Sequence, residues 1–476
     1  MPAGNHQGQI LERRYRGEHP FHTLLYLFQG DYANLLKAVV YYVIKHSGVW
    51  AMPLITASII DVVTQPEKHP ITDLWFYLGV LVVILLLNIP THYLYIRCIS
   101  TATRRMETKL RAALARRLQQ LSMIFYARRS TGALQTKLLR DVEVIQQMMM
   151  QLFQVIPSAS ITLVFAIGVT AVRAPVFLIF YVIAVPISVL LNKYLRSTIQ
   201  ERNRDFRHEV EDMSSALIEM INLIPITRAH GIEHHELRRV ERKLDNVREA
   251  GVRLDSINAV FGAMAWVAFR ITEMLCLGLA AYAAYKHLFS VSVGDVIMLA
   301  GFFSNLTSSV LMILNLIPDI TRGFESIYSI GEVLECPDLE QNEGKTPVEK
   351  VHGQFTFDGV GFVYPDTDEH SLCDISLHVQ PGETLAIVGP SGAGKSTMLN
   401  LVIGFLRPTE GRILLDGRDM NALDLRTYRR QLSVVPQETI LFEGTIRDNI
   451  LYGMRDVDEA RLQQALDDAN AREFIS

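Results

Sequence analysis

The stretch Glu383-Thr-Leu-Ala-Ile-Val-Gly-Pro-Ser-Gly-Ala-Gly-Lys-Ser-Thr397 decides the fold of the C-terminal part of this chain. An apolar run at 385–388 enters a loop that fits the pattern G-x-x-x-x-G-K-[ST] from Gly389 to Ser396, and a helical pattern follows at once. The order of strand, glycine loop and helix predicts a P-loop, which binds phosphate groups. The alternative, a glycine turn that holds no ligand, requires all four specified positions to occur by chance.

The residue types of the loop suit phosphate binding. Glycines let successive backbone N–H groups turn inward around phosphate oxygens, and the following helix directs its positive dipole end at the same anion. Lys395 is expected to reach the β- and γ-phosphates, and the Ser396 hydroxyl is expected to ligate Mg²⁺. The predicted phosphate-binding residues are Gly389, Pro390, Ser391, Gly392, Ala393, Gly394, Lys395, Ser396 and Thr397.

Composition predicts that part of the chain lies in a membrane. Hydrophobic residues make up 49% of the 476 residues, and the mean hydropathy of +0.18 is high for a soluble protein of this size. The net charge is only −4, so no basic field indicates nucleic acid as a partner. The four cysteines are far apart in the sequence, which favours neither a disulfide framework nor a zinc site.

Six apolar segments are each long enough to cross a hydrocarbon core. They lie at 35–63, 72–98, 145–171, 174–194, 255–285 and 294–317. Two long basic segments separate spans 2 and 3 and spans 4 and 5, whereas the opposite connections are short and nearly free of Lys and Arg. By the positive-inside rule, both termini and both long segments are expected in the cytosol.

The long segments read as helical extensions of the spans beside them. Span 2 is expected to continue as one helix to Gln120, far beyond the membrane. Turn signals predict a break in each extension, at 129–132 in the first, and at 222–225 and Gly231 in the second. These extensions are expected on the same side of the membrane as the P-loop, which makes them candidates for mechanical docking.

A few polar side chains fall inside the expected spans. They are Lys45 and His46 in span 1, Gln147, Gln151 and Gln154 in span 3, and Arg270 with Glu273 in span 5. Hydrogen bonds and ion pairs between helices explain such residues, and so does contact with a transported molecule. The sequence leaves both interpretations open.

The pattern divides the chain into four parts. Residues 1–34 form a polar N-terminal segment with an interfacial helix, 35–335 a six-helix membrane domain, 336–351 a linker and 352–476 an α/β domain. Besides the P-loop strand, strands are expected near 354–364, 372–379, 412–415 and 432–435, with a turn at Asp416. Helices are expected at 396–405, 445–451 and 457–470.

Short motifs around the P-loop resemble one family. Phe362-Val-Tyr-Pro365 and Val434-Val-Pro-Gln-Glu438 are similar to the A-loop and Q-loop of ATP-binding-cassette (ABC) exporters, and 389–397 to their Walker A loop. Phe125-Tyr-Ala-Arg-Arg-Ser-Thr-Gly-Ala-Leu134 resembles their first coupling segment, and Ile226-Thr-Arg-Ala-His-Gly-Ile-Glu233 their second intracellular loop. With six spans before the P-loop domain, the chain is identified as an ABC exporter half-transporter.

The resemblance implies a fold and a function. The fold is a helical membrane bundle followed by an α/β P-loop domain, and the activity is ATP-driven export of a drug, lipid or peptide. Tyr364 would stack on adenine, Ser396 would hold Mg²⁺, and Gln437 would sense Mg²⁺ and the γ-phosphate. The chain would work with a second half-transporter, identical or related, as a multi-pass protein of the cell membrane.

One departure from the family concerns catalysis. Nothing after Gln437 reads as an L-S-G-G-Q signature, an apolar strand ending in Asp-Glu, or a switch histidine, so no catalytic residue is assigned. We therefore expect a C-terminally truncated sequence that binds ATP but hydrolyses it poorly, because positioning and charge stabilisation supply most phosphoryl-transfer catalysis. The alternative function is a nucleotide-gated membrane regulator or scaffold that binds ATP and moves no solute.

Overall fold

The computed structural model describes residues 14–365, 367, 369–437, 439–454 and 457–475, without the side chains of 184–197, 265, 314 and 474. The chain divides into two compact units. Unit 1 contains residues up to 121 together with 128–339, and unit 2 contains Ser122–Ala127 and 340–476.

Unit 1 is helical and contains five helices that are long and apolar enough to cross a membrane, counted over the described residues. They are α3 (Tyr32–Thr64), α4 (Ile71–Gln120), Thr131–Arg173, α9 (Glu233–Tyr285) and α10 (Val293–Leu334). Thr131–Arg173 is made of α6 (Thr131–Thr136), the π-helical turn η1 (Lys137–Asp141) and α7 (Val142–Arg173). These helices confirm five of the expected spans. The remaining one, 174–194, falls on α8 (Leu178–His230), where the side chains of 184–197 are outside the described part.

The helical extensions follow the sequence at 129–132 and at Gly231 but not at 222–225. Helix α4 runs unbroken to Gln120 as predicted, and Ser130 accepts a hydrogen bond from the Ala133 N–H to begin α6. The break predicted at 222–225 is wrong, because α8 continues through it and ends only at Gly231, where φ is +64°. Pro225 removes one backbone donor from the helix. The carbonyl left without that donor lies on a solvated extension, where water can bind it.

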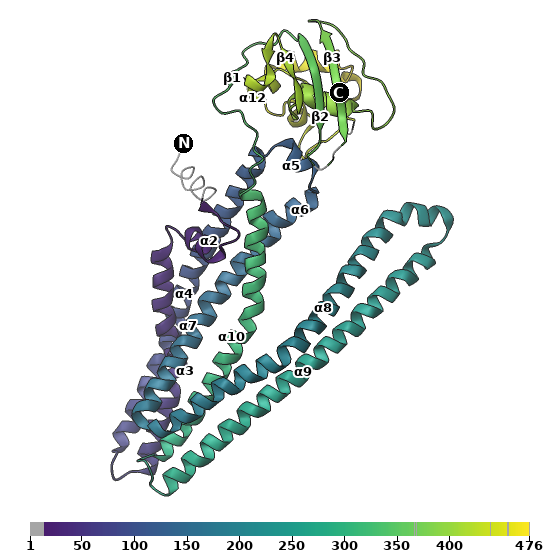
Figure 1. The fold of residues 1–476 in the computed structure, drawn as a ribbon. Coiled ribbons are helices and arrows are strands. Elements are labelled where there is room, and N and C mark those ends of the chain that lie inside the picture. Colours follow the sequence, from purple (N-terminus) through teal and green to yellow (C-terminus); the bar gives the residue numbers. More distant parts are fainter. Residues whose placement is uncertain (1–13, 366, 368, 438, 455–456, 476) are drawn as a thin grey trace. The chain divides into compact units, whose positions relative to one another are not determined.

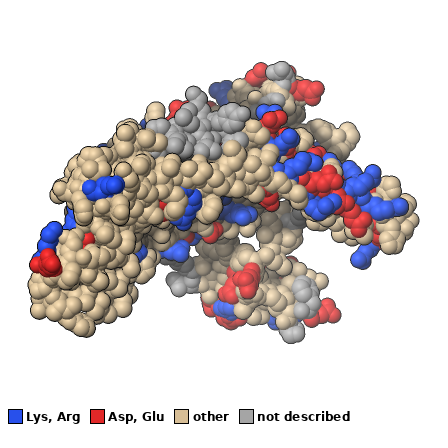
Figure 2. All heavy atoms as spheres, turned by 90° about the horizontal axis from the view of Figure 1, so that it is seen from below, with Lys and Arg blue, Asp and Glu red and all other residues tan. Residues whose placement is uncertain are grey.

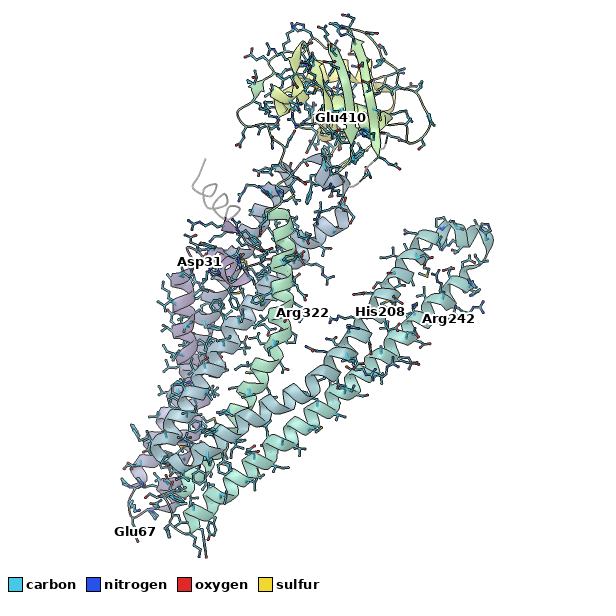
Figure 3. The ribbon with its side chains drawn as sticks, in the orientation of Figure 1. Asp31, Glu67, His208, Arg242, Arg322 and Glu410 are labelled. Atoms are coloured by element: carbon cyan, nitrogen blue, oxygen red, sulfur yellow. The ribbon has the colours of Figure 1, made fainter. Side chains whose placement is uncertain are left out.

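Helices α3, α4, α7 and α10 lie side by side in unit 1, whereas α8 and α9 pair as a long hairpin (Figure 1). Asp31 and Glu67 mark opposite ends of α3 and its flanking turns (Figure 3). Seen from the Glu67 end, the surface is mostly uncharged, and Lys, Arg, Asp and Glu gather on the arm that α8 and α9 form (Figure 2). The core between α7, α9 and α10 is apolar and includes Phe302 and Phe303, which are fully buried.

A polar clasp joins three helices at the Glu67 end. The Asp61 carboxylate accepts hydrogen bonds from the Ser292 hydroxyl and the Gly294 N–H, each at 3.0 Å, at the first turn of α10. Arg173 lies 3.8 Å from Asp61 and 3.3 Å from Asp295. A side chain of α3 thereby accepts from one of the backbone N–H groups that the first turn of α10 leaves unpaired. The approach is so close that a Cβ at Gly294 would lie 2.2 Å from the Ala57 carbonyl oxygen.

The clasp gives a stability prediction with a matched control. Gly294→Ala is expected to destabilise the protein by about 1–3 kcal/mol, because the added methyl meets backbone that cannot move aside. Gly168→Ala, in α7, has nothing within 4 Å of the added Cβ. It should be neutral or stabilising by about 0.5–1 kcal/mol. Thermal unfolding in detergent measures both variants, and equal melting temperatures would contradict the close packing.

A buried carboxylate holds the other end of the bundle. Asp31 is 2% exposed and contacts Arg105 at 3.0 Å and Lys109 at 3.1 Å, both on α4. Burial alone would raise the pKa of Asp31, but hydrogen bonds from Lys109 and Arg105 outweigh it and lower the pKa. The contact therefore stabilises the fold when Asp31 is ionised.

This contact predicts a pH dependence. A lowered native pKa stabilises the fold fully above the unfolded value of about 3.9, and the gain is lost as pH falls through the native value. Asp31→Asn should cost about 1–3 kcal/mol at pH 7, and the difference from the natural protein should shrink below about pH 4. Thermal unfolding between pH 8 and pH 3 measures it. A difference that stays constant down to pH 3 would rule out the ionised contact.

Unit 2 is built on an antiparallel sheet in the order β3-β2-β4-β5. The strands are β2 (Phe355–Val363), β3 (His370–Val379), β4 (Glu410–Leu415) and the short β5 (Arg418–Asp419). β2, β3 and β4 confirm three predicted strands, and Asp416 with φ of +49° confirms the turn after β4. The helices α11 (Lys395–Ile403), α13 (Ile446–Ile450) and α14 (Glu459–Asp468) confirm the predicted helices.

Two predicted strands are absent from the described sheets. The runs at 385–388 and 432–435 have no strand assignment, and Val388 and Val435 are 88% and 94% exposed. A strand forms only when a neighbour accepts its ladder hydrogen bonds, and parallel strands need such neighbours on both sides to become buried. Within the described residues neither run has one. Both runs therefore have the apolar pattern of a strand but form no ladder of hydrogen bonds with another described strand.

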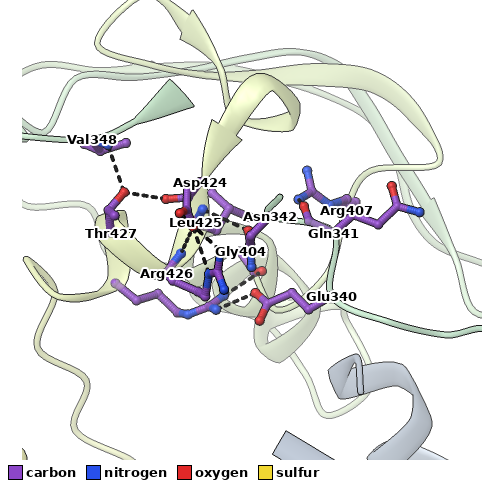
Figure 4. Close-up of polar contacts among 11 residues, drawn as sticks. Glu340, Gln341, Asn342, Val348, Gly404, Arg407, Asp424, Leu425, Arg426 and Thr427 are labelled. Carbon is purple, nitrogen blue, oxygen red and sulfur yellow. Dashed lines mark hydrogen bonds and ion pairs between the residues drawn. The ribbon is translucent and has the colours of Figure 1, made fainter. Parts of the chain in front are cut away.

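The segment before the sheet is fastened to unit 2 (Figure 4). The short strands β1 (Thr346–Pro347) and β6 (Leu423–Asp424) pair in parallel. Asn342 Oδ1 accepts a hydrogen bond from the Leu425 N–H at 3.1 Å, and the Val348 N–H donates to Thr427 Oγ1 at 2.8 Å. Much of the polar segment 336–351 therefore has a fixed path on this unit.

The helix α5 (Met123–Ala127) belongs to unit 2, although its neighbours in sequence belong to unit 1. Ile124 packs against the apolar core of unit 2, and Phe125 is 3% exposed. A segment that begins directly after a membrane-spanning helix is thus part of the P-loop unit.

Candidate nucleotide site

The loop 389–394 leads directly into α11. Gly392 and Gly394 both have φ of +84°, a left-handed conformation that favours glycine. The Gly394 backbone also passes close to β3, since a Cβ there would lie 2.6 Å from the Ser371 carbonyl oxygen. The first turn of α11 is thereby held against the sheet with its N–H groups at the loop.

The predicted phosphate-binding lysine folds back over this loop. Lys395 Nζ donates hydrogen bonds to the carbonyl oxygens of Gly389 at 3.0 Å and Pro390 at 2.6 Å. An ammonium group at this point places positive charge at the mouth of the loop, beside the N-terminal end of α11. A helix N-terminus and a cation together form a site for an anion.

Two neighbouring hydroxyls differ in their surroundings. Ser396 is exposed, whereas Thr397 is 6% exposed. The Thr397 hydroxyl lies 3.3 Å from the Tyr364 hydroxyl, so the aromatic residue after β2 contacts the P-loop helix. The Tyr364 ring stands edge-on to Phe362 with 4.8 Å between the ring centres. Phe362, which holds the Tyr364 ring, was not predicted as a site residue, although the alternation along β2 marks it as an inward position.

The remaining predicted site residue, Gln437, has no described hydrogen bond to the P-loop. It is exposed and follows the extended run 432–435. No group of three His, Cys, Asp or Glu side chains able to hold a metal gathers in the described part of the chain. An exposed hydroxyl such as that of Ser396 suits a Mg²⁺ ion whose other ligands are phosphate oxygens and water.

Both units of the chain match known protein families. Residues 35–310 match the ABC transporter transmembrane region and residues 372–476 match the ABC transporter domain. The chain belongs to the ABC transporter family. It combines the membrane region of these proteins with their nucleotide-binding domain, as in ABC exporters. The chain is thus an integral membrane protein with a domain of the ABC ATPase type.

Two ABC proteins illustrate the similarity. The chain is 27% identical over 438 residues to YgaD of Bacillus subtilis (strain 168), whose name assigns it to multidrug export, and the match covers 91% of this chain and 75% of YgaD. It is 25% identical over 413 residues to the ATP-dependent lipid A-core flippase of Chromobacterium violaceum, covering 86% of this chain and 69% of the flippase.

A solved structure shows the same fold. The structure of a bacterial Atm1-family ABC exporter with ATP bound superposes with a TM-score of 0.75 at 21% identity. The match covers 93% of this chain and 77% of that one. The exporter fold predicted from the sequence is confirmed by this likeness and by the family matches.

The two left-handed glycines of the P-loop give a matched pair of variants. Gly392→Ala adds only backbone strain, about 1–2 kcal/mol, because nothing lies within 4 Å of its Cβ. Gly394→Ala carries the same strain and also places a methyl against the Ser371 carbonyl. It should lower the thermal stability of unit 2 further than Gly392→Ala does. Calorimetry of the purified chain tests the order, and the reverse order would show that α11 does not press on β3.

Proposed function

We propose that this chain is one half of a dimeric ABC exporter that uses ATP to move a drug, lipid or peptide out across the membrane. The observation that carries the proposal is the P-loop lysine, Lys395, at the start of a helix in a chain that also carries a bundle of membrane-spanning helices. The names of the relatives, multidrug export and lipid A-core flippase, support cargo of an amphipathic kind.

The residues of the nucleotide site take separate roles in this proposal. The loop 389–394 surrounds the phosphates with N–H groups. Lys395 exchanges its hydrogen bonds to two carbonyl oxygens for hydrogen bonds to β- and γ-phosphate oxygens. Ser396 and Gln437 hold Mg²⁺, which neutralises phosphate charge when it is bound. Tyr364 stacks on the adenine ring.

The membrane bundle senses the nucleotide through α5 in this proposal. Ile124 and Phe125 are packed in unit 2, while the same chain runs on from α4, a helix of the bundle. Because α5 packs in the P-loop unit and follows α4 after a two-residue break, a change of that unit is proposed to reach the membrane bundle through this stretch of chain. Nucleotide that binds more tightly to one arrangement of the two units shifts the bundle toward that arrangement.

A second half-transporter, identical or related, completes the protein in this proposal. On the extension of α8, Ile218, Ile221 and Ile226 are 62%, 58% and 53% exposed. The charged residues of the hairpin gather on the extensions of α8 and α9, as expected for parts outside the lipid (Figure 2). Apolar surface in water favours contact with a partner. The basic extensions support the proposal that both termini lie in the cytosol. The bundle is proposed to lie in the cell membrane.

The P-loop assignment predicts a clear binding defect. Lys395→Ala should abolish binding of a fluorescent Mg-ATP analogue, because the charge over the loop is lost. Tyr364→Ala should weaken binding by about 1–3 kcal/mol, the contribution of one stacked base. Arg412→Ala is the control, since Arg412 is paired with Asp358 on the sheet surface. Unchanged affinity in the Lys395 variant would refute the nucleotide site.

We expect the 476-residue chain to bind ATP well but to hydrolyse it slowly. A chain of these 476 residues is proposed to bind ATP with little hydrolysis, since no general base has been assigned among them. Adding a complete ABC C-terminal region should raise the ATPase rate by orders of magnitude, because positioning of water and phosphate supplies most of the acceleration. Phosphate release measures both. This assignment would be overturned if the 476-residue chain hydrolysed ATP rapidly and Lys395→Ala abolished that hydrolysis.

A regulator or scaffold that binds ATP without moving solute shares the same site. Only the movement of a solute distinguishes the two functions. Reconstituted transport of a fluorescent amphipathic dye, dependent on ATP, favours export, and nucleotide binding without any transport favours regulation.

A further inference from the structure

An arginine and a glutamate lie near the middle of the apolar part of α9. The run from Ala259 to Tyr285 is interrupted by the polar residues Arg270, Thr272 and Glu273. At 1.5 Å per residue, Arg270 lies about 17 Å from Ala259 and about 22 Å from Tyr285. Arginine side chains reach the membrane surface only from positions near the ends of a helix. Arg270 is therefore surrounded by hydrocarbon unless water or protein replaces it.

The two charges are paired but differ in exposure. Arg270 Nη1 donates a hydrogen bond to Glu273 Oε2 at 2.7 Å. The Glu273 side chain is 11% exposed, whereas the Arg270 side chain is 46% exposed. Charged residues at this depth face the interior of a bundle or a water-filled space, because contact with lipid is strongly unfavourable. The exposed part of Arg270 is therefore expected to face water or protein, and not lipid.

The burial pattern of α9 shows on which side of the helix this arginine lies. Phe269 and Cys276 are buried in the apolar core of unit 1, whereas Ile271 and Leu275 are 56% and 58% exposed. Successive residues of an α-helix are turned by about 100°. Arg270 therefore lies between the buried side and the exposed apolar side. Water along that edge of the helix reaches Arg270 and leaves Ile271 and Leu275 in lipid.

The guanidinium group stands over an aromatic ring and has unused donors. Arg270 Cζ lies 5.7 Å from the ring centre of Trp266, one turn earlier on α9, and Trp266 is 61% exposed. Among the described residues, Glu273 is the only hydrogen-bond acceptor for the five N–H groups of this guanidinium. The other N–H groups form a planar fork that fits oxyanions such as carboxylate and phosphate. A ring beside such a fork suits a ligand with an anionic group and an apolar body.

We propose that Arg270 and Trp266 bind the cargo of this exporter and select molecules that carry an oxyanion. The guanidinium of Arg270 pairs with the oxyanion, the Trp266 ring contacts the apolar part of the cargo, and Glu273 holds the guanidinium from its buried side. This inference rests on the proposed export function. The ATP-binding test of Lys395 does not involve these residues, so the two proposals can fail separately.

Two naphthalene dyes that differ in a sulfonate isolate the contribution of charge. Anilinonaphthalene sulfonate carries the oxyanion, and phenylnaphthylamine has the same rings without it. The chain has three tryptophans, so Trp50→Phe and Trp75→Phe leave Trp266 as the only donor of excitation energy to either dye. The full chain with these two changes is titrated with each dye in discs of phosphatidylcholine bilayer. The saturable part of the energy transfer, after subtraction of empty discs, gives a dissociation constant.

The sulfonate is the group that Arg270 should recognise. Arg270→Gln should weaken binding of anilinonaphthalene sulfonate about tenfold or more, since a charge-assisted hydrogen bond is lost, and should leave phenylnaphthylamine binding unchanged. Arg270→Lys keeps the charge but not the planar fork, so it should have a smaller effect in the same direction. Arg253→Gln is the matched control, because Arg253 is 54% exposed on the same helix and pairs with Glu249. It should alter the binding of neither dye.

Three results would overturn the proposal. One is an unchanged dissociation constant for anilinonaphthalene sulfonate in Arg270→Gln, and a simultaneous loss of dimer in light scattering would mean that a second copy covers Arg270. Another is equal weakening in the Arg253 and Arg270 variants, which means diffuse attraction by positive charge. The third is equal weakening of both dyes in Arg270→Gln, which means that the oxyanion is not recognised.

A melting temperature shows whether each variant is folded. Arg270→Gln leaves the buried Glu273 carboxylate without its partner, so this variant can fail to fold. Arg270→Lys retains a cation for Glu273 and then decides the question. Equal affinity of the natural chain and the folded Arg270→Lys variant for anilinonaphthalene sulfonate would in that case overturn the proposal.

Discussion

Hydrocarbon offers no hydrogen bonds, and this constraint shapes the whole of unit 1. Backbone that crosses the membrane must pair its N–H and C=O groups within its own helix. Polar side chains also need partners, which neighbouring helices can supply, and the contact of Asp61 with the first turn of α10 is one example. A helix that is already continuous at the membrane boundary extends beyond it at little further cost, as does α4, which is 50 residues long in all. A membrane domain of this kind therefore has long helices that project from the membrane into the solvent.

The sequence predicted the features that depend on local pattern. Length and apolarity identified the membrane helices, and alternation identified β2, β3 and β4. Ser130 and Gly231 were recognisable as helix ends because their residue types favour those conformations. The glycine loop and Lys395 were recognisable because four residue types at fixed spacing are required to hold phosphate, and the structure brings them together at the start of α11.

Features that depend on distant partners could not be predicted in the same way. The runs at 385–388 and 432–435 have the composition of strands, but a ladder requires a neighbour that composition does not reveal. Pro225 suggested a break that its solvated surroundings do not require. The burial of Phe125 in unit 2 and the approach of Gly294 to Ala57 each join residues far apart in the sequence. Periodicity contains no information about such pairs.

The place of α5 in the chain sets an order of assembly. Residues 122–127 leave the ribosome before α7 to α10, and the rest of unit 2 follows only after them. At a synthesis rate of ~5–20 residues per second, this interval lasts roughly 10–40 s. During that time Ile124 and Phe125 have no core to enter. The membrane helices must therefore be inserted while the short apolar segment α5 is still exposed. Unit 2 can fold around α5 only after its remaining residues have been synthesised. Until then the apolar side chains of Ile124 and Phe125 stay exposed on the ribosome-bound chain, and exposed apolar surface of this kind is what chaperones bind in general.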